Sequence, residues 1–534
     1  MSGERQNNQP EQLGLAFPTD SRSEAPTAGG GGTETPMAKR MHESPAGTEV
    51  LMEEVCEREN CQQALRRVKA NKGSPGVDGM TVRGLPDHLK QHWPAIREQL
   101  LSGTYRPQPV KRVEIDKPDG GGVRKLGVPT VLDRFIQQAV LQVLQRRWDR
   151  TFSDHSYGFR PGRSAHQAVE RAQQYVTEGY RWVVDLDLEK FFDRVGHDKL
   201  MAKIAARVSD RRMLKLIRAF LTAGVMENGL VSAVDEGTPQ GGPLSPLLSN
   251  LVLDELDREL ERRGHRFVRY ADDSNVYVRS ERAGQRVMTS LTAFITRRLK
   301  LKVNSQKSAV ARPAERKFLG FSFTSDLQPK RRIAPKALQR FKERVRELTS
   351  RMRGVSLTRM VEELSAYLRG WQGYFGFCQT PTVLQGLEKW LRRRLRSVLW
   401  KQWKRGRTRF TELRKRGIGR ELAAKTAGSA HGPWRLAASP ALSYALPNAY
   451  FDSLGLPTLV ISERPNPPNR PDADPPVRWC GRGARVTAPP MPIGRLREPR
   501  CFEGATLPGG EHVLSARPGI SWPPCTCDEH RHAS

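Results

Sequence analysis

The stretch Trp182-Val-Val-Asp-Leu-Asp-Leu-Glu-Lys-Phe-Phe-Asp193 decides how the rest of the chain is interpreted. It begins as an apolar segment typical of a strand and ends in acidic residues and two aromatic ones. Because side chains alternate across a strand, Asp185 and Asp187 are expected on one face, opposite the apolar residues between and beside them. A buried strand normally avoids charge, so the two acids require a functional or structural reason.

A second acidic segment, Tyr270-Ala-Asp-Asp273, lies between two β-rich flanks. This pattern predicts a hairpin whose tip spans about 271–275 and carries Asp272 and Asp273. Either acidic pair alone is typical of a solvated turn. Together, they indicate a site for divalent cations in phosphoryl transfer, because hard cations prefer oxygen ligands.

Between the acidic segments lies Glu236-Gly-Thr-Pro-Gln-Gly-Gly-Pro-Leu-Ser-Pro-Leu-Leu-Ser-Asn250. Its proline and glycine content predicts a tight loop, and Pro243 is expected to open a helix that continues through Leu256. The loop would bring backbone N–H groups and the Gln240 amide close to a planar ligand. An ordinary helix-entry loop explains the same residues equally well.

Composition points to a polyanionic partner. The chain has 534 residues, with 89 Lys and Arg against 57 Asp and Glu, and a formal net charge of +32. Such an excess favours nucleic acid as the partner. No apolar run reaches the roughly 18 residues that a membrane helix needs, and the seven scattered cysteines are typical of a reducing compartment.

The sequence predicts an α+β fold with a helical C-terminal part. We expect a disordered arm over 1–50, a mixed domain over 51–330 with an N-terminal extension over about 51–104, a basic helical domain over 331–425, a further segment over 426–464 and an irregular tail over 465–534. Within the mixed domain, a strand pair is expected over about 105–130 and helices at about 51–69, 133–147, 199–222, 243–262 and 283–300.

Four motifs in this order resemble the reverse transcriptases encoded by group II introns. From the N-terminus, they are the segment Asn71–Gly79, the fingers–palm signature Ser156–His166, the loop Gly237–Pro246 and the Tyr270–Asp273 box. The resemblance runs over about 55–460. It implies a right-hand polymerase with fingers and palm, followed by a helical thumb and maturase (X) domain.

The resemblance also implies which acids are catalytic. Asp187, Asp272 and Asp273 would bind two Mg²⁺ ions, with Mn²⁺ as a substitute. Asp187 takes this role rather than Asp185 because it lies five residues before Phe192, the aromatic residue that would pack under the incoming sugar and exclude a 2′-hydroxyl.

Further nucleotide contacts follow from the same resemblance. Gln240 would line the nucleotide pocket, and Lys117 and Arg124 would bind the triphosphate. Lys307 would assist protonation of the leaving group, although a solvated lysine fits that position equally well. The segment Phe318–Phe323 matches the primer-grip hairpin.

The basic helical part is the predicted RNA-binding surface. Residues 331–420 contain 25 Lys and Arg but only 6 Asp and Glu. An apolar stripe with a solvated basic face is the plain alternative, but the density of charge favours a surface that follows RNA phosphates. The residues expected to contact RNA are Arg392, Arg393, Arg394, Arg396, Lys401 and Lys404.

The resemblance implies a nucleotidyltransferase: an RNA-directed DNA polymerase that copies intron RNA and also acts as a maturase in splicing and mobility. Its partners would be group II intron RNA, an RNA template with a DNA primer or target DNA, and dNTPs. The protein would act in the bacterial cytoplasm without a membrane partner, and the resemblance is compatible with a homodimer. Two alternatives remain, a splicing maturase with a vestigial polymerase and a non-intron, retron-like reverse transcriptase. The tail spacing Cys525-Thr-Cys527 does not suit a zinc-bound nuclease module.

Overall fold

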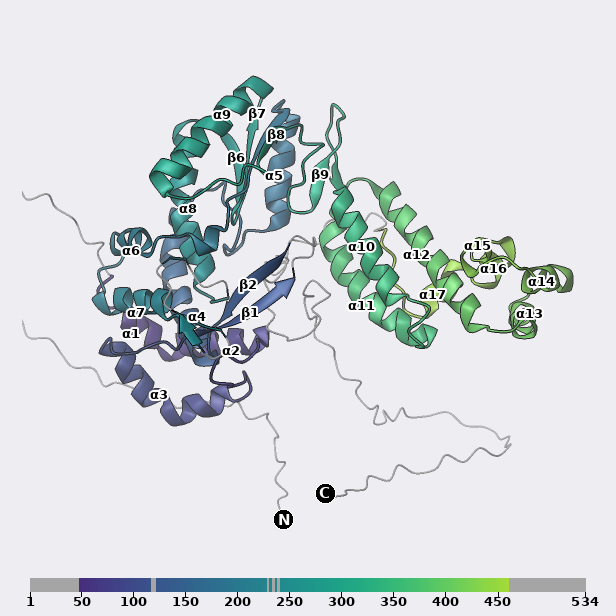
Figure 1. The fold of residues 1–534 in the computed structure, drawn as a ribbon, viewed down its shortest axis with the longest axis horizontal. Helices are drawn as coiled ribbons and strands as arrows, with labels where there is room; N and C mark the ends of the chain where they lie inside the picture. The colour runs from purple at the N-terminus through teal and green to yellow at the C-terminus, as the bar shows by residue number, and fades with distance from the viewer. Residues whose placement is uncertain (1–47, 117–121, 228–229, 233–235, 238–240, 461–534) are drawn as a thin grey trace, which may run out of the picture. The chain divides into compact units, whose positions relative to one another are not determined.

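A computed structural model of the chain describes residues 48–116, 122–227, 230–232, 236–237 and 241–460 (Figure 1). The predicted disordered arm and irregular tail lie almost wholly outside these ranges. In the described part, helices and strands alternate up to residue 333, and only helices follow. This order agrees with the predicted α+β fold that ends in a helical part.

Three helices, α1 to α3, form the N-terminal extension: Leu51–Cys56, Arg58–Asn71 and Leu85–Leu101. The single helix expected over 51–69 is interrupted at Glu57, whose backbone is extended (φ −58°, ψ 141°). Helix α2 packs on α4 (Val131–Trp148). There the buried Asn60 amide donates to the Ala139 carbonyl at 3.1 Å, so the extension and α4 belong to one core.

The first sheet has the strand order β2-β1-β4-β5. Its strands span Val110–Asp116 (β1), Val123–Val128 (β2), Val225–Glu227 (β4) and Leu230–Ser232 (β5). The antiparallel hairpin β1–β2 confirms the strand pair expected over 105–130. Strand β4 pairs in parallel with β1, an association between distant segments that local pattern could not reveal.

The second sheet carries the acidic segments and has the order β6-β7-β3-β8, with every pairing antiparallel. Its strands span Trp182–Leu186 (β3), Arg266–Tyr270 (β6), Asp273–Val278 (β7) and Ala309–Ala311 (β8). The hairpin is confirmed, but its tip contains only Ala271 and Asp272, because Asp273 already belongs to β7.

Helices cover both faces of this second sheet (Figure 1). Val183, Val268 and Tyr277 pack in one cluster with α5, while the alternate residues Val184 and Val276 belong to the larger core. That core includes α8 and α9. The helices involved are α5 (Ala165–Thr177), α8 (Ser245–Arg262) and α9 (Glu281–Phe294), which the π-helical turn η3 (Ile295–Leu299) extends.

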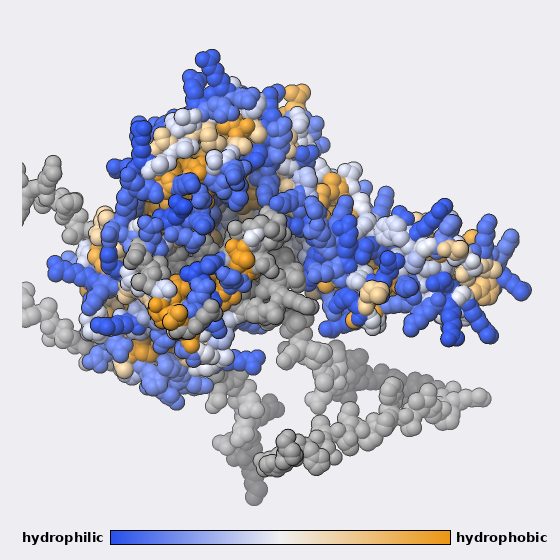
Figure 2. All heavy atoms as spheres, viewed as in Figure 1, coloured by the Kyte–Doolittle hydropathy of each residue, from blue (hydrophilic) through white to orange (hydrophobic). Residues whose placement is uncertain are grey.

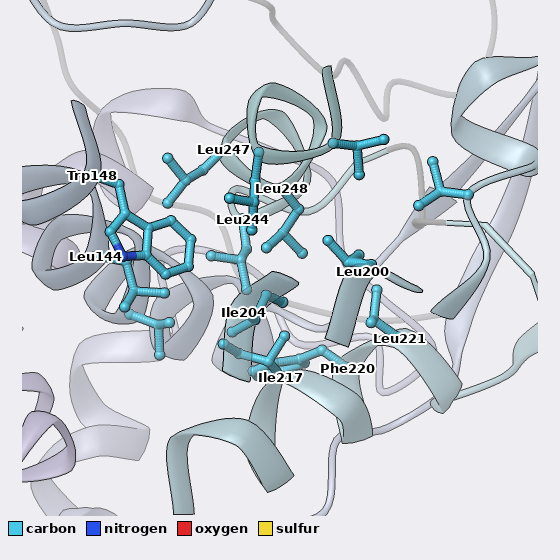
Figure 3. Close-up of a cluster of buried hydrophobic side chains, with 14 of the residues drawn as sticks. Leu144, Trp148, Leu200, Ile204, Ile217, Phe220, Leu221, Leu244, Leu247 and Leu248 are labelled. Carbon is cyan, nitrogen blue, oxygen red and sulfur yellow. The ribbon is translucent and has the colours of Figure 1, made fainter. Parts of the chain in front are cut away.

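Helix α8 begins later than predicted. Pro243 lies in the turn before it, Leu244 is the N-cap residue, and Pro246 occupies the first turn, where a proline costs no hydrogen bond. Figure 3 shows apolar side chains gathered around this helix start. Leu247 and Leu248 meet side chains from α4, α6 (His197–Ala205) and α7 (Arg211–Thr222), which replace the single helix expected over 199–222.

Short elements complete the mixed part. Two 3₁₀ turns, η1 and η2, span Asp149–Thr151 and Phe191–Asp193. Strands β9 (Phe321–Phe323) and β10 (Arg331–Ile333) form an antiparallel hairpin. The segment Phe318–Phe323, predicted to match the primer-grip hairpin, supplies only the first of these strands.

The C-terminal helices share one hydrophobic core. They are α10 (Pro335–Leu348), α11 (Leu357–Phe375), α12 (Pro381–Gln402), α13 (Gly406–Lys415), α14 (Arg420–Ala427), α15 (Pro433–Leu436), α16 (Pro440–Ala445) and α17 (Asn448–Ser453). Phe341, Leu395 and Phe451 belong to the same buried cluster, so the predicted segments 331–425 and 426–464 are packed together. Among the described helices, none combines the length and apolarity needed to span a membrane.

Candidate active site

Strand pairing brings the predicted catalytic acids to one end of the second sheet. Leu186 of β3 is in register with Ser274 of β7. Asp187, the next residue, and Asp273, the first residue of β7, therefore leave the sheet at the same end, and Asp272 lies in the adjoining turn. Eighty-five positions of sequence separate Asp187 from Asp272, yet the antiparallel register makes them neighbours.

The electrostatics of Asp273 depend on the other carboxylates. Burial and, after it, the negative charges of Asp272, Asp185 and Asp187 together raise the pKa of Asp273 to about 7, and Lys317 acts against this rise. Asp273 is nevertheless exposed to solvent. The carboxylate is thus surrounded by protein on most sides while remaining open to a ligand.

The backbone of Asp187 is held from a distant turn. Its N–H donates to Ser308 Oγ at 3.0 Å, and its carbonyl accepts from the Asn304 N–H at 2.8 Å. Lys307, in the same turn, lies with Nζ 3.6 Å from Asp187 Oδ2. The predicted nucleotide contact Lys307 is therefore adjacent to a predicted metal ligand, which is 29% exposed.

Asp185 is used differently from Asp187. Its Oδ2 accepts from Arg316 Nε at 2.9 Å and from an Arg316 terminal nitrogen at 2.6 Å. Burial raises the pKa of Asp185, although Arg316 acts against that rise. Because this carboxylate is already bound to a guanidinium, the geometry favours Asp187 as the ligand.

Arg269 is the main structural residue that the sequence interpretation missed. Its side chain is fully buried and forms an ion pair with Asp257 at 2.5 Å. The same guanidinium donates to Asn250 Oδ1 at 3.0 Å and to the Ala271 carbonyl at 2.9 Å. Asn250 and Asp257 are seven residues apart and therefore on one face of α8, a spacing that indicates a polar stripe on this helix but not which residue meets it.

The same arginine fixes the acidic turn. Ala271 adopts a left-handed conformation (φ 56°), which costs free energy for a residue with a Cβ. Gly158 packs beneath this turn, where a Cβ would lie 2.3 Å from the Ala271 nitrogen. Its carbonyl accepts from the Asn250 amide at 2.9 Å, and the neighbouring Ser156 Oγ accepts from Arg269 at 2.7 Å. The fingers–palm signature thus supports the acidic turn directly.

Two glycines of the predicted nucleotide loop, Gly237 and Gly241, pack closely against other parts of the chain. A Cβ on Gly241 would lie 2.1 Å from the Gly127 carbonyl oxygen, and one on Gly237 would lie 2.9 Å from the Phe192 carbonyl oxygen. The Gly237 carbonyl also lies 2.6 Å from His197 Nε2. These glycines allow the loop to pack closely on β2 and η2.

The remaining predicted nucleotide contacts are placed unevenly. Phe192 is half-buried in η2, and its ring lies 5.2 Å from the ring of the buried Phe191, which is a core residue as expected. Arg124 lies on β2, opposite Ile115, and its side chain is outside the described part. Lys117 and Gln240 also lie outside the described residues.

The acids form an incomplete ligand set. Among the described residues, no group of three or more His, Cys, Asp or Glu side chains is gathered closely enough to hold a metal ion by itself. The raised pKa of Asp273 records clustered negative charge that a cation would neutralise. Hard oxygen donors open to solvent fit Mg²⁺, which is commonly held by one or two carboxylates together with substrate phosphates.

In the basic helical part, Arg392 has a structural role. It is buried, and its guanidinium donates to Glu388 at 3.1 Å and to Asp452 at 3.0 Å. Glu388 also accepts from the Val460 N–H at 3.1 Å. Arg392 therefore connects α12 to the C-terminal segment and has no accessible surface for a phosphate.

Three other predicted RNA contacts are also engaged within the fold. Arg393 donates to the Trp434 carbonyl and lies 4.3 Å from the Trp434 ring centroid. Arg394 donates to Thr349 Oγ1, and Arg396 donates to the Leu446 carbonyl. All three remain partly exposed. These interactions orient the guanidinium groups but leave part of each side chain at the surface.

Lys401 and Lys404, at the end of α12, are exposed and make no ion pair within the described part of the chain. They are the predicted RNA contacts with the greatest freedom to meet a phosphate. Figure 2 shows hydrophilic residues over much of the visible face of the C-terminal helices.

The mixed part and the helical part of the chain each match a known protein family model. Residues 115–323 match a family model described as reverse transcriptase (RNA-dependent DNA polymerase), and residues 338–417 match one described as group II intron, maturase-specific domain. The chain combines a reverse-transcriptase domain with a group II intron maturase domain.

Two curated relatives are similar to parts of the chain. The chain is 41% identical over 207 residues to protein YkfC of Escherichia coli (38% of this chain, 54% of the relative). It is 30% identical over 325 residues to the group II intron-encoded protein LtrA of Lactococcus lactis subsp. cremoris (48% and 54%). The chain thus spans about half the length of these relatives.

One solved structure is also similar in part. The match to one chain of a partial Cas6-RT-Cas1–Cas2 complex covers 46% of this chain and 42% of that chain, with 25% identity and a TM-score of 0.31.

The domain assignments fit the observed packing. The reverse-transcriptase match begins within β1 and ends with β9, so it contains the rest of both four-stranded sheets and all three predicted catalytic acids. The maturase domain extends from α10 to just beyond α13 and contains the six predicted RNA contacts. Helices α1 to α3 precede the matched region but share the core of the reverse-transcriptase domain.

Proposed function

We propose that this protein is an RNA-directed DNA polymerase encoded by a group II intron, and that it also binds the intron RNA as a maturase. The observation that carries the proposal is the convergence of acids from β3 and the β6–β7 turn within a reverse-transcriptase domain. A retron-like enzyme is disfavoured, because the polymerase domain is followed by a maturase-specific domain.

The proposed reaction joins a primer 3′-hydroxyl to the α-phosphate of a dNTP and releases pyrophosphate. Two Mg²⁺ ions, when bound, supply Lewis-acid activation of the phosphate and stabilise the attacking and leaving oxygens. Asp187, Asp272 and Asp273 are the residues that would hold them. The backbone hydrogen bonds to Asp187 and the Arg269 contact to the turn keep these carboxylates in place.

The other site residues have positioning roles in this proposal. Phe192 packs against the core through Phe191, and its half-buried ring would support the sugar. Lys307 carries a positive charge next to Asp187, so it can balance the carboxylate before substrate arrives and meet phosphate afterwards. Lys117, Arg124 and Gln240 remain proposed contacts to the triphosphate and the base.

A vestigial polymerase is the less favoured alternative. Burial of Asp273 and the charges of three other carboxylates raise its pKa, so ionising this group costs free energy in the absence of a cation. A protein that used only its RNA-binding surface would have no physical need for this cluster.

Primer extension tests the proposal. The purified chain, given an RNA template, an annealed DNA primer and dNTPs, should extend the primer with Mg²⁺ or Mn²⁺ and lose this activity when EDTA is added. RNA binding, measured separately in EDTA, should persist. Binding without any extension product would leave only the maturase role.

A further inference from the structure

A cavity lies in the maturase domain, away from the catalytic acids. Its volume is about 550 Å³, and it is formed by the α10–α11 connection, the end of α12 and the start of α13. Pockets of this size accommodate small organic ligands, including a nucleotide. The Gln402 amide donates to the Val355 carbonyl at 2.9 Å, which joins the α10–α11 connection to α12.

The rim of the cavity is basic and contains no acid. Arg351, Lys401, Lys404 and Arg409 line it, and none of them pairs with a carboxylate in the described part of the chain. Nearby cations behave differently: Arg353 pairs with Glu363 at 2.6 Å. The cavity therefore concentrates uncompensated positive charge, which favours a phosphate ligand.

The floor of the cavity is apolar. Met360 and Val398 are buried, and Val355 is half-buried. Arg409 lies 4.8 Å from the Trp400 ring centroid and donates to the Trp403 carbonyl, so its guanidinium has a fixed orientation. A cationic rim above an apolar floor matches a phosphodiester joined to a base, since single-strand sites combine phosphate contacts with an apolar surface for the base.

We propose that this cavity binds one unpaired nucleotide of a single strand, with the phosphodiester on Lys401, Lys404 and the two arginines and the base against Val355, Met360 and Val398. The inference rests on the proposed nucleic-acid-binding function and adds a discrete nucleotide site to it. A paired base cannot enter the cavity because it is stacked inside a duplex. The site therefore distinguishes unpaired from paired strands.

Equilibrium binding of labelled 20-nucleotide oligouridylate, oligothymidylate and a 20-base-pair RNA duplex tests this proposal in the full chain. Lys401→Ala with Lys404→Ala should weaken single-strand binding about tenfold and reduce its salt slope by about 1. The matched control, Lys389→Ala with Lys425→Ala, removes two exposed lysines elsewhere in the same region and should have a much smaller effect.

Val355→Trp tests the cavity without changing charge. The indole should fill the space for the base and weaken single-strand binding, while duplex binding and the melting temperature stay close to wild type. Unchanged single-strand binding, or equal losses for single strand and duplex, would overturn the proposal. The two single strands show whether the ribose or the deoxyribose form is preferred.

The outcomes also separate this inference from the proposed function. If the wild-type chain binds none of the three nucleic acids, the nucleic-acid-binding function itself fails. If the wild type binds them and both cavity variants behave like the lysine control, only the cavity assignment fails. Tighter binding of polyglutamate than of oligouridylate, abolished by the cavity variants, would assign the site to an acidic protein and refute a nucleotide.

Discussion

The palm acids and the arginines of helix α12 are both dense clusters of one charge, but the fold treats them in opposite ways. Asp273 is surrounded by other carboxylates and its pKa is raised, whereas Arg392 is enclosed by Glu388 and Asp452. In the first cluster, Lys307 and Arg316 pair with Asp187 and Asp185, yet the pKa of Asp273 stays raised. In the second cluster, the two carboxylates pair directly with Arg392. Charge that remains uncompensated is therefore a better guide to function than charge density in the sequence.

The largest expected effect separates Asp187 from its neighbour on the same strand face. Asp187→Asn should reduce primer extension on the order of 10²–10³-fold or more, because it removes a metal-binding carboxylate. Asp185→Asn should reduce the rate far less and mainly lower the melting temperature, because Asp185 binds Arg316. Single-turnover extension and thermal melting of both variants provide the measurement.

Equal losses of extension rate in the two variants, with melting unchanged, would show that Asp185 and Asp187 have the same role. The distinction between Asp187, which has Lys307 at 3.6 Å, and Asp185, which is bound to the Arg316 guanidinium, would then be wrong.

An intermediate effect is expected for Arg392 of the maturase domain. Arg392→Met should lower the free energy of unfolding by about 1–3 kcal/mol, because the Glu388 and Asp452 carboxylates lose the hydrogen bonds that Arg392 donates. The cost should not be larger, since Glu388 retains hydrogen bonds from the C-terminal segment. Denaturant unfolding measures this change, and the salt dependence of RNA binding should remain that of the wild type.

A reduced salt slope with unchanged stability would place Arg392 at the RNA surface after all. Lys389→Ala, on the exposed side of the same helix, is the control for loss of one positive charge without loss of buried contacts.

The smallest effect is the pH dependence that Asp273 gives to stability. Its pKa in the folded protein, about 7, is above the ordinary value of 3.8, so the folded state holds this proton more tightly than the unfolded chain does. Stability contributed by the protonated form is present at low pH and is lost as the pH rises from about 4 to 7. Asp273→Asn should therefore melt near the wild-type temperature at pH 4.5 and above it at pH 8, in the absence of divalent ions.

A melting difference that is independent of pH would contradict the raised pKa. Addition of Mg²⁺ at pH 8 should narrow the difference, because the cation stabilises the ionised wild-type carboxylates but not the amide.

Sequence predicted the acidic core of the site because its elements are local. Alternation placed Asp185 and Asp187 on one face, and the apolar flanks around the Asp272–Asp273 pair identified the hairpin. The exact turn was predicted less well, because pairing of Tyr270 with Asp273 depends on the whole sheet. The break between α1 and α2 was missed for a similar reason, because the apolar residues before and after Glu57 keep a roughly helical spacing.

The partners of buried charges could not be predicted from local pattern. Arg269 meets Asp257 and Ser156, which are 12 and 113 residues away. Arg392 meets Asp452, 60 residues along the chain. A single sequence shows the charge of each residue but not which of these distant residues folding brings together, so the basic stripe of α12 was interpreted as surface.

The support of Asp187 by Ser308 has a consequence for the order in which the protein is made. Strand β8 is the last strand to join the second sheet, and its preceding turn supplies the hydrogen bonds to the Asp187 backbone. During synthesis, all three acids leave the ribosome before the residues that hold Asp187 in place. A growing chain that ends before residue 304 contains all three acids but not the residues that hold Asp187, so the proposed polymerase activity should begin only when this late turn has docked.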